Sequence, residues 1–180
     1  LAQDINEENI DCSNITTVNL DEYINVPSNN ESSCYYRMYE QFFKHISLRK
    51  DQILFLNDIT EQDDLEQKCI EFDKKIEKSG GIDIQFLGIG RNGHIGFNEP
   101  GTPFETMTHV SRINDESREA KIDTFGTYEN VPKLGITMGI KSIMMAKKIV
   151  LLAKGSSKAD IIYKSLFGPV TPDVPASVLQ

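Results

Sequence analysis

Cysteine is scarce in this sequence, and no two cysteines have the CxxC spacing of a metal or redox site. The three are Cys12, Cys34 and Cys69, an odd number spread along 180 residues. We therefore expect neither a disulfide framework nor a zinc site, and we predict no bound metal. A reducing compartment is the default for such a chain, which predicts a cytoplasmic protein.

Positive charge and long apolar runs are also in short supply. The chain has 19 Lys and Arg against 27 Asp and Glu, a formal net charge of -8. This balance argues against a nucleic-acid partner, because phosphate backbones are held by fields of Lys and Arg. No apolar run is long enough to cross a membrane, so no membrane partner is predicted. A small phosphorylated ligand is compatible with the charge, since one or two local cations can hold it.

Both ends of the sequence lack the features of a natural terminus. The first residues have no start Met, no basic region and no apolar segment typical of a signal peptide. The last residues, 174–180, stop on an apolar step without a helix cap. We therefore expect the chain to be a part of a longer one. Its 180 residues, 39% of them hydrophobic, are still enough for one domain with a sizeable core.

Short β-branched or apolar runs alternate with helical patterns along the whole chain. The predicted strands cover residues 15–20, 53–56, 82–87, 110–113 and 149–153. The last run is apolar throughout, which is typical of a central parallel strand buried on both faces. The alternation predicts an α/β fold, a three-layer, Rossmann-like, mostly parallel sheet with helices on both faces, incomplete at both ends. No linker or repeat interrupts it, so residues 1–180 are interpreted as a single domain.

Capping residues and apolar periodicity place helices between these strands. The predicted helices cover residues 33–46, 60–80, 132–144 and 155–168. Ser32 or Ser33 would be the N-cap of the first, and Thr60 that of the second. Pro132 suits the first turn of the third helix, where a missing N–H costs nothing.

Three predicted strand ends carry groups suited to chemistry. They are the Asp21–Glu22 pair, the loop over residues 88–101 and the stretch from Gly155 to Lys158. Ligands bind at the carboxyl ends of strands in open α/β sheets. We therefore expect these three segments to converge on one site.

The loop at residues 88–101 reads GIGRNGHIGFNEPG and contains a formal GxGxxG at Gly88, Gly90 and Gly93. A dinucleotide site would need a helix directly after this motif and an acid about 20 residues further on for the ribose. The segment Asn98–Gly101 breaks the chain too early for that helix. No nicotinamide or flavin cofactor is therefore predicted. We interpret the glycines as positions where the backbone approaches a ligand.

His94 and Glu99 lie in this loop and have two interpretations. A His titrates near neutrality, and a neighbouring Glu can orient it and raise its pKa, which suits proton transfer. Alternatively, His94 is a loop histidine bonded to a carbonyl and Glu99 an exposed turn residue. The residues alone leave both interpretations open.

Asp21 and Lys158 also have two interpretations each. Asp21 follows a buried strand, where a raised pKa would suit a base, or it caps a turn. Lys158 would bind a phosphate at a helix start, or it is a solvated side chain. A cation is disfavoured at a helix N-terminus by the helix dipole, which favours the phosphate interpretation.

The order of these motifs resembles the glucosamine-6-phosphate deaminase family. The matching runs are VNLDEY at 18–23, the whole loop at 88–101, VPK at 131–133, ITMG at 136–139 and GSSKA at 155–159. They cover nearly the whole chain, and related 6-phosphogluconolactonases lack the Asn-Glu-Pro ending of the loop. The resemblance implies conversion of glucosamine 6-phosphate and water to fructose 6-phosphate and ammonia, with no cofactor.

The resemblance also implies catalytic roles. Asp21 would remove the C2 proton of the open-chain sugar, and His94 would handle the ring-oxygen proton during ring opening. Glu99 would support His94. Asn92 occupies a position that is Asp in some members of the family and Asn in others, and it belongs to the same catalytic set.

The substrate would be held by Gly88, Gly90 and Arg91 of the loop and by Lys158, which matches a phosphate-binding lysine of the family. An arginine that helps to hold the phosphate in some members would fall near Asp123. The family's first strand, its Thr/Ser/Gly-rich phosphate loop and its C-terminal strand and helix have no counterpart here. We therefore expect poor phosphate binding from a chain of this length, and activity from a longer parent.

Three alternatives stay open at this point. A sugar-phosphate-sensing domain of a bacterial regulator would share the fold but would need no base, and a lactonase would hydrolyse 6-phosphogluconolactone. The chain could also be an inactive truncated deaminase. The predicted partner is a small amino-sugar phosphate, with glucosamine and galactosamine not separated, and a homo-oligomer is compatible with the family.

Overall fold

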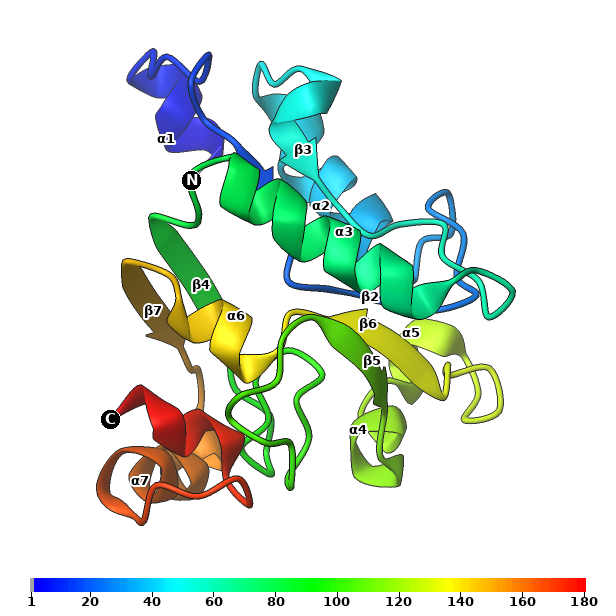
Figure 1. Cartoon of the computed structure of the whole chain (residues 1–180), viewed down its shortest axis with the longest axis vertical. Helices are drawn as coiled ribbons and strands as arrows, with labels where there is room; N and C mark the ends of the chain where they lie inside the picture. The colour runs from blue at the N-terminus through cyan, green and yellow to red at the C-terminus, as the bar shows by residue number, and fades with distance from the viewer. Residues whose placement is uncertain (1) are drawn as a thin grey trace.

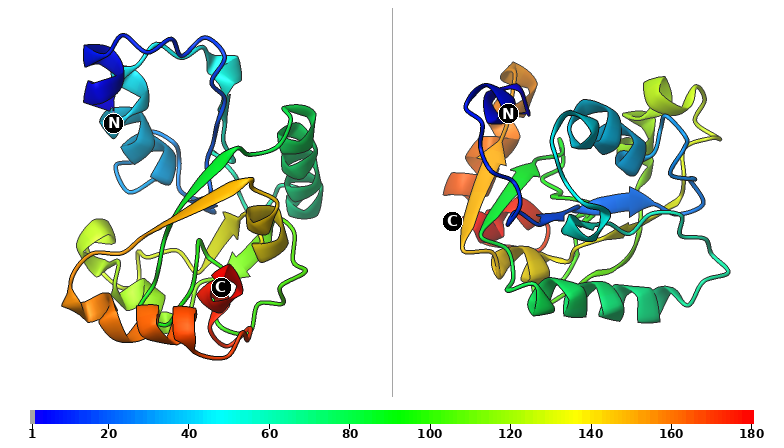
Figure 2. Two further views of the ribbon diagram at one scale, coloured as in Figure 1. Left: turned by 90° about the vertical axis from the view of Figure 1, so that its left-hand side faces the viewer. Right: turned by 90° about the horizontal axis from the view of Figure 1, so that it is seen from above.

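The structure, a computed structural model, describes residues 2–180, and it has strands lying between helices (Figure 1). The helices α2 (Cys34–Gln41) and α3 (Leu65–Lys78) lie on opposite sides of the strands in the right-hand view of Figure 2. The predicted α/β class with helices on both faces is therefore confirmed. Within residues 2–180, no helix combines the length and the apolar character needed to cross a bilayer.

The remaining elements are short. The strands are β1 (Thr17–Val18), β2 (Asp21–Tyr23), β3 (Ile53–Leu54), β4 (Ile84–Gly88), β5 (His109–Arg112), β6 (Leu134–Thr137) and β7 (Lys148–Leu152). The other α-helices are α1 (Ala2–Glu7), α4 (Asp115–Glu119), α5 (Ile122–Phe125), α6 (Ile140–Met144) and α7 (Ala159–Phe167). Single 3-10 turns cover Phe43–His45, Lys50–Gln52, Ser156–Lys158 and Pro175–Leu179.

The described strands form three sheets, which contain four pairings. β1 pairs with β3, and β4 pairs with β7, both in parallel. β6 lies between β2 and β5 and pairs with each of them antiparallel. Asp21 of β2 and His109 of β5 are both in register with Thr137 of β6. This register places the start of β2 beside the end of β6.

One apolar core connects the ladders with the helices. Ile136 of β6 and Ile143 of α6 are completely buried, and Leu87 of β4 is 1% exposed. The helix α3 contributes Cys69, Phe72 and Ile76, all of them buried. The β4 strand therefore enters the core just before the glycine-rich loop begins.

The predicted N-cap of α2 is confirmed, and the predicted N-cap of α3 is wrong. Ser33 is the N-cap of α2, and its side chain accepts a hydrogen bond from the Tyr36 amide. Thr60 is not the N-cap of α3, because that role belongs to Asp64. The Thr60 amide and hydroxyl instead donate to Asp63, at 2.7 and 2.9 Å, in a turn before the helix. The Thr–Asp pair closes a local turn that resembles a capping box in sequence.

Two strand predictions and one helix prediction also need correction. Residues 21–23 form a strand of their own, β2, because they pair with β6 instead of ending the preceding strand. Pro132 leads into β6 and not into a helix, since the four residues after Lys133 lie between two strands. Among the described residues, β7 pairs only with β4 and is partly exposed, so it is not a central strand buried on both faces.

Candidate active site

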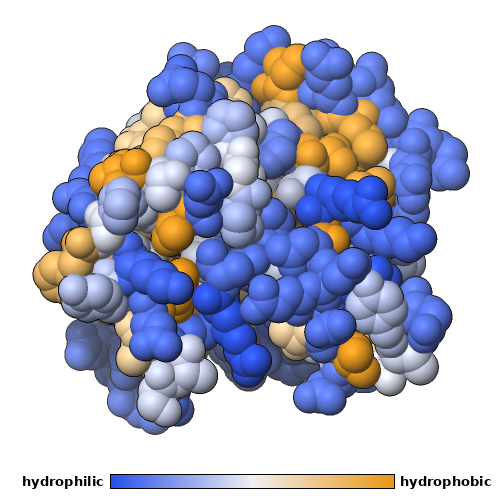
Figure 3. Space-filling model, turned by 90° about the horizontal axis from the view of Figure 1, so that it is seen from below, coloured by the Kyte–Doolittle hydropathy of each residue, from blue (hydrophilic) through white to orange (hydrophobic). Residues whose placement is uncertain are grey.

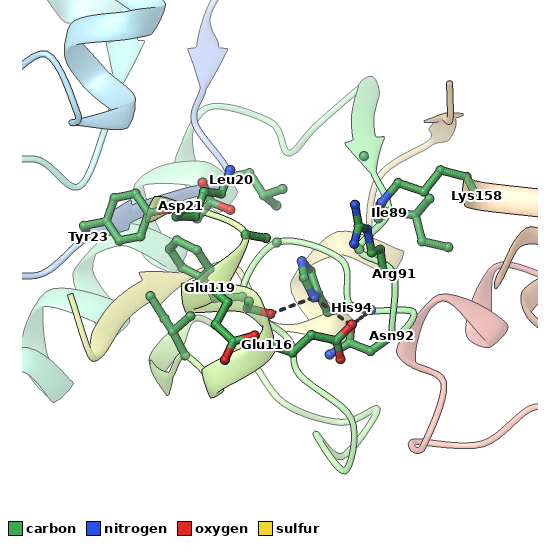
Figure 4. Close-up of a pocket in the computed structure, with 18 of the residues that line it drawn as sticks. Leu20, Asp21, Tyr23, Ile89, Arg91, Asn92, His94, Glu116, Glu119 and Lys158 are labelled. Carbon is green, nitrogen blue, oxygen red and sulfur yellow. Dashed lines mark hydrogen bonds between the residues drawn. The ribbon is translucent and has the colours of Figure 1, made fainter. Parts of the chain in front are cut away.

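A cavity of about 670 Å³ lies between β2, the loop after β4 and the helices α4 and α5 (Figure 4). All the predicted site residues except Glu99 line it, namely Asp21, Gly88, Gly90, Arg91, Asn92, His94 and Lys158. Glu99 lies behind His94, in contact with Asn92. The three segments that the sequence singled out therefore do converge on one site.

Asp21 stands at the edge of this cavity, at the first position of β2. Burial raises the pKa of its half-buried carboxyl, and the nearby charge of Glu22 adds to the effect, giving a value of about 6. The side chains of Cys34, Lys121 and Arg37 act in the opposite direction. Asp21 can therefore both accept and release a proton close to neutral pH.

Glu22, the next residue, has a structural role. It is completely buried, and its carboxylate accepts hydrogen bonds from Ser33 Oγ at 2.8 Å and from the amides of Cys34 and Tyr35 at 3.0 and 2.9 Å. A carboxylate at a helix N-terminus is favoured by the helix dipole. Glu22 thus fixes the start of α2 directly behind Asp21.

His94 is held by a short chain of polar side chains. Its Nδ1 lies 2.8 Å from Asn92 Oδ1, and its backbone amide donates to the same oxygen at 3.1 Å. Asn92 Nδ2 in turn donates to Glu99 Oε2 at 2.9 Å. Because the Asn92 oxygen only accepts, Nδ1 of His94 carries the proton towards it. Nε2 is then the basic nitrogen of the ring.

The charge of His94 is set by its surroundings. Burial lowers the pKa of the imidazole, and the nearby Glu99 carboxylate works against this. Lys158 and Lys121 lower this pKa further, whereas Glu116 raises it. The net direction is downward, so the imidazole is neutral near pH 7 and able to accept a proton.

Gly90 makes room for the ring of His94. Its amide donates to the His94 carbonyl at 2.9 Å, which closes the loop tightly. A Cβ built on Gly90 would lie closer than 3.0 Å to three atoms of the imidazole. Gly88 differs, because a Cβ there would meet no atom within 4 Å. Gly90 lines the cavity, as the sequence predicted, and the close approach of the His94 ring is a second reason for a glycine at this position.

Cations gather at the end of the cavity that lies away from Asp21. Arg91 and Lys158 lie together there in Figure 4, and Lys158 Nζ donates to the Ile89 carbonyl at 2.6 Å. Burial lowers the pKa of Lys158, and the charges of Arg91 and Lys121 add to this effect. Mutual repulsion among three cations is relieved when an anion binds between them.

The helices α4 and α5 supply residues that the sequence interpretation missed. Glu116, Ser117, Glu119, Lys121 and Asp123 all line the cavity. Ser117 Oγ lies 3.3 Å from His94 Nδ1, so α4 contacts the imidazole directly. The helix α4 lies at the lower right of Figure 1, and the face seen from below in Figure 3 is mostly hydrophilic. The charged composition of α4 and α5 is also that of an ordinary solvent-exposed helix, so the sequence did not indicate that these helices belong to the site.

Comparison with known proteins agrees with the resemblance of the motifs. A family model described as glucosamine-6-phosphate isomerases/6-phosphogluconolactonase matches residues 1–180. A glucosamine-6-phosphate deaminase of Clostridioides difficile (strain 630) is 43% identical over 180 residues, 100% of this chain and 72% of the relative. One of Thermoanaerobacter sp. (strain X514) is 49% identical over 170 residues, 94% of this chain and 66% of the relative.

A solved structure is also similar over the whole chain. It is described as a monomeric glucosamine-6-phosphate deaminase, and it is 44% identical with a TM-score of 0.94. The match covers 99% of this chain and 73% of that one. The predicted α/β fold is thus found in a close relative, and the chain spans about 70% of the length of the proteins that it matches.

Proposed function

We infer the activity from one premise: this chain belongs to the glucosamine-6-phosphate isomerase/6-phosphogluconolactonase family. Relatives that are 43% to 49% identical are glucosamine-6-phosphate deaminases. The chain accordingly converts glucosamine 6-phosphate and water to fructose 6-phosphate and ammonia. The observation that carries this is a cavity lined by a carboxyl group with a pKa near 6, a neutral imidazole and a group of cations.

Ring opening is the step that we assign to His94. The sugar ring opens when the proton of the C1 hydroxyl leaves and a proton reaches the ring oxygen. Nε2 of a neutral His94 can take the first proton and deliver it to the second oxygen. Asn92 and Glu99 hold the ring through Nδ1 and stabilise the imidazolium that forms between the two transfers.

Isomerisation is the step that we assign to Asp21. Its carboxylate removes the proton from C2 of the open-chain aldehyde while a proton of the substrate ammonium group moves to O1, which gives an enolamine. The same carboxyl then returns a proton to C1, so that C1 becomes an alcohol and C2 an imine. The raised pKa of Asp21 suits both directions, because the group is neither too weak a base nor too weak an acid.

Hydrolysis completes the reaction without a further oxidant or reductant. Water adds to the C2 imine, the C–N bond breaks, and ammonia leaves with the proton that it needs. C2 loses two electrons when it becomes the ketone carbon, and C1 gains two when it becomes the alcohol carbon. The oxidation and the reduction therefore balance within the sugar. No step in this sequence requires a metal or a cofactor.

The phosphate is assigned to the cationic end of the cavity. Arg91 and Lys158, predicted from the sequence, lie there, and Lys121 also lines the cavity, where its charge acts on both Lys158 and Asp21. We propose that Lys121 supplies the charge that an arginine near position 123 supplies in some members of the family. Gly88 and Gly90 border the same space and would contact the sugar.

Three further sequence predictions stay proposals. They are a single domain over residues 1–180, a cytoplasmic location and a homo-oligomer. The oligomer is not needed for the assignments above, because one chain supplies each residue that is given a role. A solved relative is itself described as monomeric.

The test of the proposed function measures products with two substrates. The test uses the full-length protein, because the sequence predicts poor phosphate binding from residues 1–180 alone. This protein should release ammonia and fructose 6-phosphate in equal amounts from glucosamine 6-phosphate. It should leave 6-phosphogluconolactone untouched. Hydrolysis of the lactone without ammonia release from the amino sugar would favour the lactonase instead, and binding without turnover would favour a sensor.

Removal of a cation at the phosphate end should weaken substrate binding. Lys121→Ala and Lys158→Ala should each raise KM for glucosamine 6-phosphate about tenfold to a hundredfold, since a hydrogen bond to a charged group contributes about 1.5–3 kcal/mol. Steady-state ammonia assays measure this. Lys147→Ala is the matched control, because Lys147 pairs with Asp83 at 2.6 Å outside the cavity. An unchanged KM in both cavity variants would remove the phosphate from this end.

A further inference from the structure

Asn114, at the junction of β5 and α4, uses both ends of its carboxamide. It is half-buried, and its Oδ1 accepts a hydrogen bond from the Ser117 amide at 2.7 Å, which caps the N-terminus of α4. Its Nδ2 donates to Glu99 Oε2 at 2.7 Å, and its backbone amide lies 3.4 Å from Glu99 Oε1. One side chain therefore connects a helix of the cavity wall with the loop that carries His94.

Glu99 is the common acceptor of this arrangement. Its side chain is only 11% exposed, and its Oε2 accepts from both Asn92 and Asn114. The same oxygen lies 3.6 Å from His94 Nδ1. Glu99 does not line the cavity, so it can act on a substrate only through His94. The position of the Glu99 carboxylate, and with it the electric field at the imidazole, depends on the side-chain amides of Asn92 and Asn114.

The helix α4 contacts His94 by a second route. Ser117 Oγ lies 3.3 Å from His94 Nδ1, and Ser117 is the residue whose amide Asn114 caps. The amide orientation of Asn114 is fixed by its neighbours, because a reversed carboxamide would point its oxygen at the Glu99 carboxylate and its NH₂ at the Ser117 N–H. The N-terminus of α4 and the His94 imidazole are therefore positioned by one connected set of side chains, those of Asn92, Glu99, Asn114 and Ser117.

We propose that Asn114 is a positioning residue of the reaction: it holds the Glu99 carboxylate against Asn92 and His94 while it caps α4, so that the proton-transfer chain and the cavity wall keep one arrangement. This inference rests on the proposed role of His94 in ring opening. Asn114 does not line the cavity and touches no substrate.

A simple helix cap is the alternative role for Asn114, and one substitution separates the two. Asn114→Asp has nearly the same shape and keeps an oxygen that caps the helix equally well. It removes the donor to Glu99 and adds a second carboxylate beside it. A residue that only caps α4 would tolerate this change, whereas a residue that positions Glu99 would not.

Asn114→Asp should lower kcat for ammonia release about tenfold or more, with the fold retained, because a hydrogen bond to a charged group is lost. It should also raise the pKa of His94 by about one unit, since an added negative charge favours the imidazolium. The charged groups that face His94 already are Glu99 of its own loop, Glu116 of α4, Lys121 after α4 and Lys158 of the 3-10 turn before α7. Asn114→Asp leaves these four charged groups in place and adds one carboxylate to them.

The pKa is measured by NMR titration of the histidine rings in wild-type protein and in the variant. The chain has three histidines, and His94→Gln identifies the signal of interest. Asp64→Ala is the matched control for loss of a helix cap, because Asp64 caps α3 through the Gln67 amide and does not line the cavity. That control should leave both kcat and the His94 titration unchanged.

A wild-type titration midpoint for His94 together with a wild-type kcat in Asn114→Asp would overturn the inference. If that variant does not fold, Asn114→Ser replaces it, because Ser also caps a helix but cannot reach Glu99 as a donor; it should lose kcat by a similar factor. An absence of ammonia release from the wild-type protein would count against the proposed function. The NMR titration would still decide the role of Asn114.

Discussion

Asp21→Asn should lower ammonia release from glucosamine 6-phosphate about a thousandfold or more, while the protein stays folded. The carboxamide of Asn cannot take the proton from C2, and general base catalysis contributes about 10²–10⁴ to a rate. Binding should change little, because Asn has the size and shape of Asp. Steady-state kinetics therefore should show a loss in kcat with a nearly unchanged KM.

The same substitution should not destabilise the protein at pH 7. The pKa of Asp21 in the folded protein, about 6, lies above the ordinary value of 3.8 for an aspartate. Its contribution to stability is therefore fully present below pH 3.8 and is lost as the pH rises through 6. At pH 7 the ionised carboxylate opposes folding, and Asn removes this charge. Thermal unfolding at pH 4 and pH 7 should show that the variant gains relative to wild type at the higher pH.

Two outcomes would remove Asp21 from its proposed role. One is a variant that keeps its rate. The other is a variant that loses its rate only because it unfolds at pH 7. The wild-type pH profile provides an independent check, because kcat should rise with pH through a limb near 6, where Asp21 becomes the base.

Gly90→Ala should have the second-largest effect on the reaction, about a hundredfold loss of kcat. A methyl group at this position would lie closer than 3.0 Å to the His94 ring, and the loop backbone is tied by the hydrogen bond from the Gly90 amide to the His94 carbonyl. The ring must therefore leave its place against the loop and lose its contact with Asn92. Overpacking of this kind costs about 1–3 kcal/mol of stability.

Gly88→Ala is the matched control for the loop, because its methyl group would meet no atom within 4 Å. Thermal unfolding and the NMR titration of His94 should be close to wild type in this control and altered in Gly90→Ala. Equal effects of the two substitutions on His94 would show that the contact at Gly90 does not position the ring.

The sequence was sufficient for the loop because its functional residues are close together in the chain. His94, Asn92 and Glu99 lie within eight positions, and glycines around them indicated an unusual backbone. Their hydrogen bonds are local and follow from that spacing. The reason for Gly90 was not predictable, since it depends on where the His94 ring turns in three dimensions.

The contribution of α4 and α5 could not be predicted in the same way. Asn114, Ser117 and Lys121 stand in a polar segment with no periodic apolar face. The contacts of Asn114 and Ser117 with the loop join residues 15 and 23 positions apart, and such pairs leave no local pattern. An Asn before a short run of acidic residues indicates a helix cap. It does not indicate that the amide nitrogen of Asn114 donates to the Glu99 carboxylate.

The strands illustrate the same limit on the scale of the fold. Apolar runs indicated β4 and β7 well, because branched apolar residues favour strands even where the strand, like β7, is only partly buried. The strand β6 was missed because residues 132–144 were interpreted as a helix, and its pairing with β2 and β5 comes from segments more than 20 residues away. Short strands of this kind are defined by their partners and not by their own composition.

Glucosamine 6-phosphate labelled with deuterium at C2 provides the most direct test of the central claim, which is that a carboxyl group moves a proton between C2 and C1. In every turnover the deuterium should leave C2 and appear at C1 of fructose 6-phosphate or in water, with ammonia released in equal amount. A product that keeps deuterium on C2, such as glucose 6-phosphate formed by direct displacement of the amine, would contradict the account.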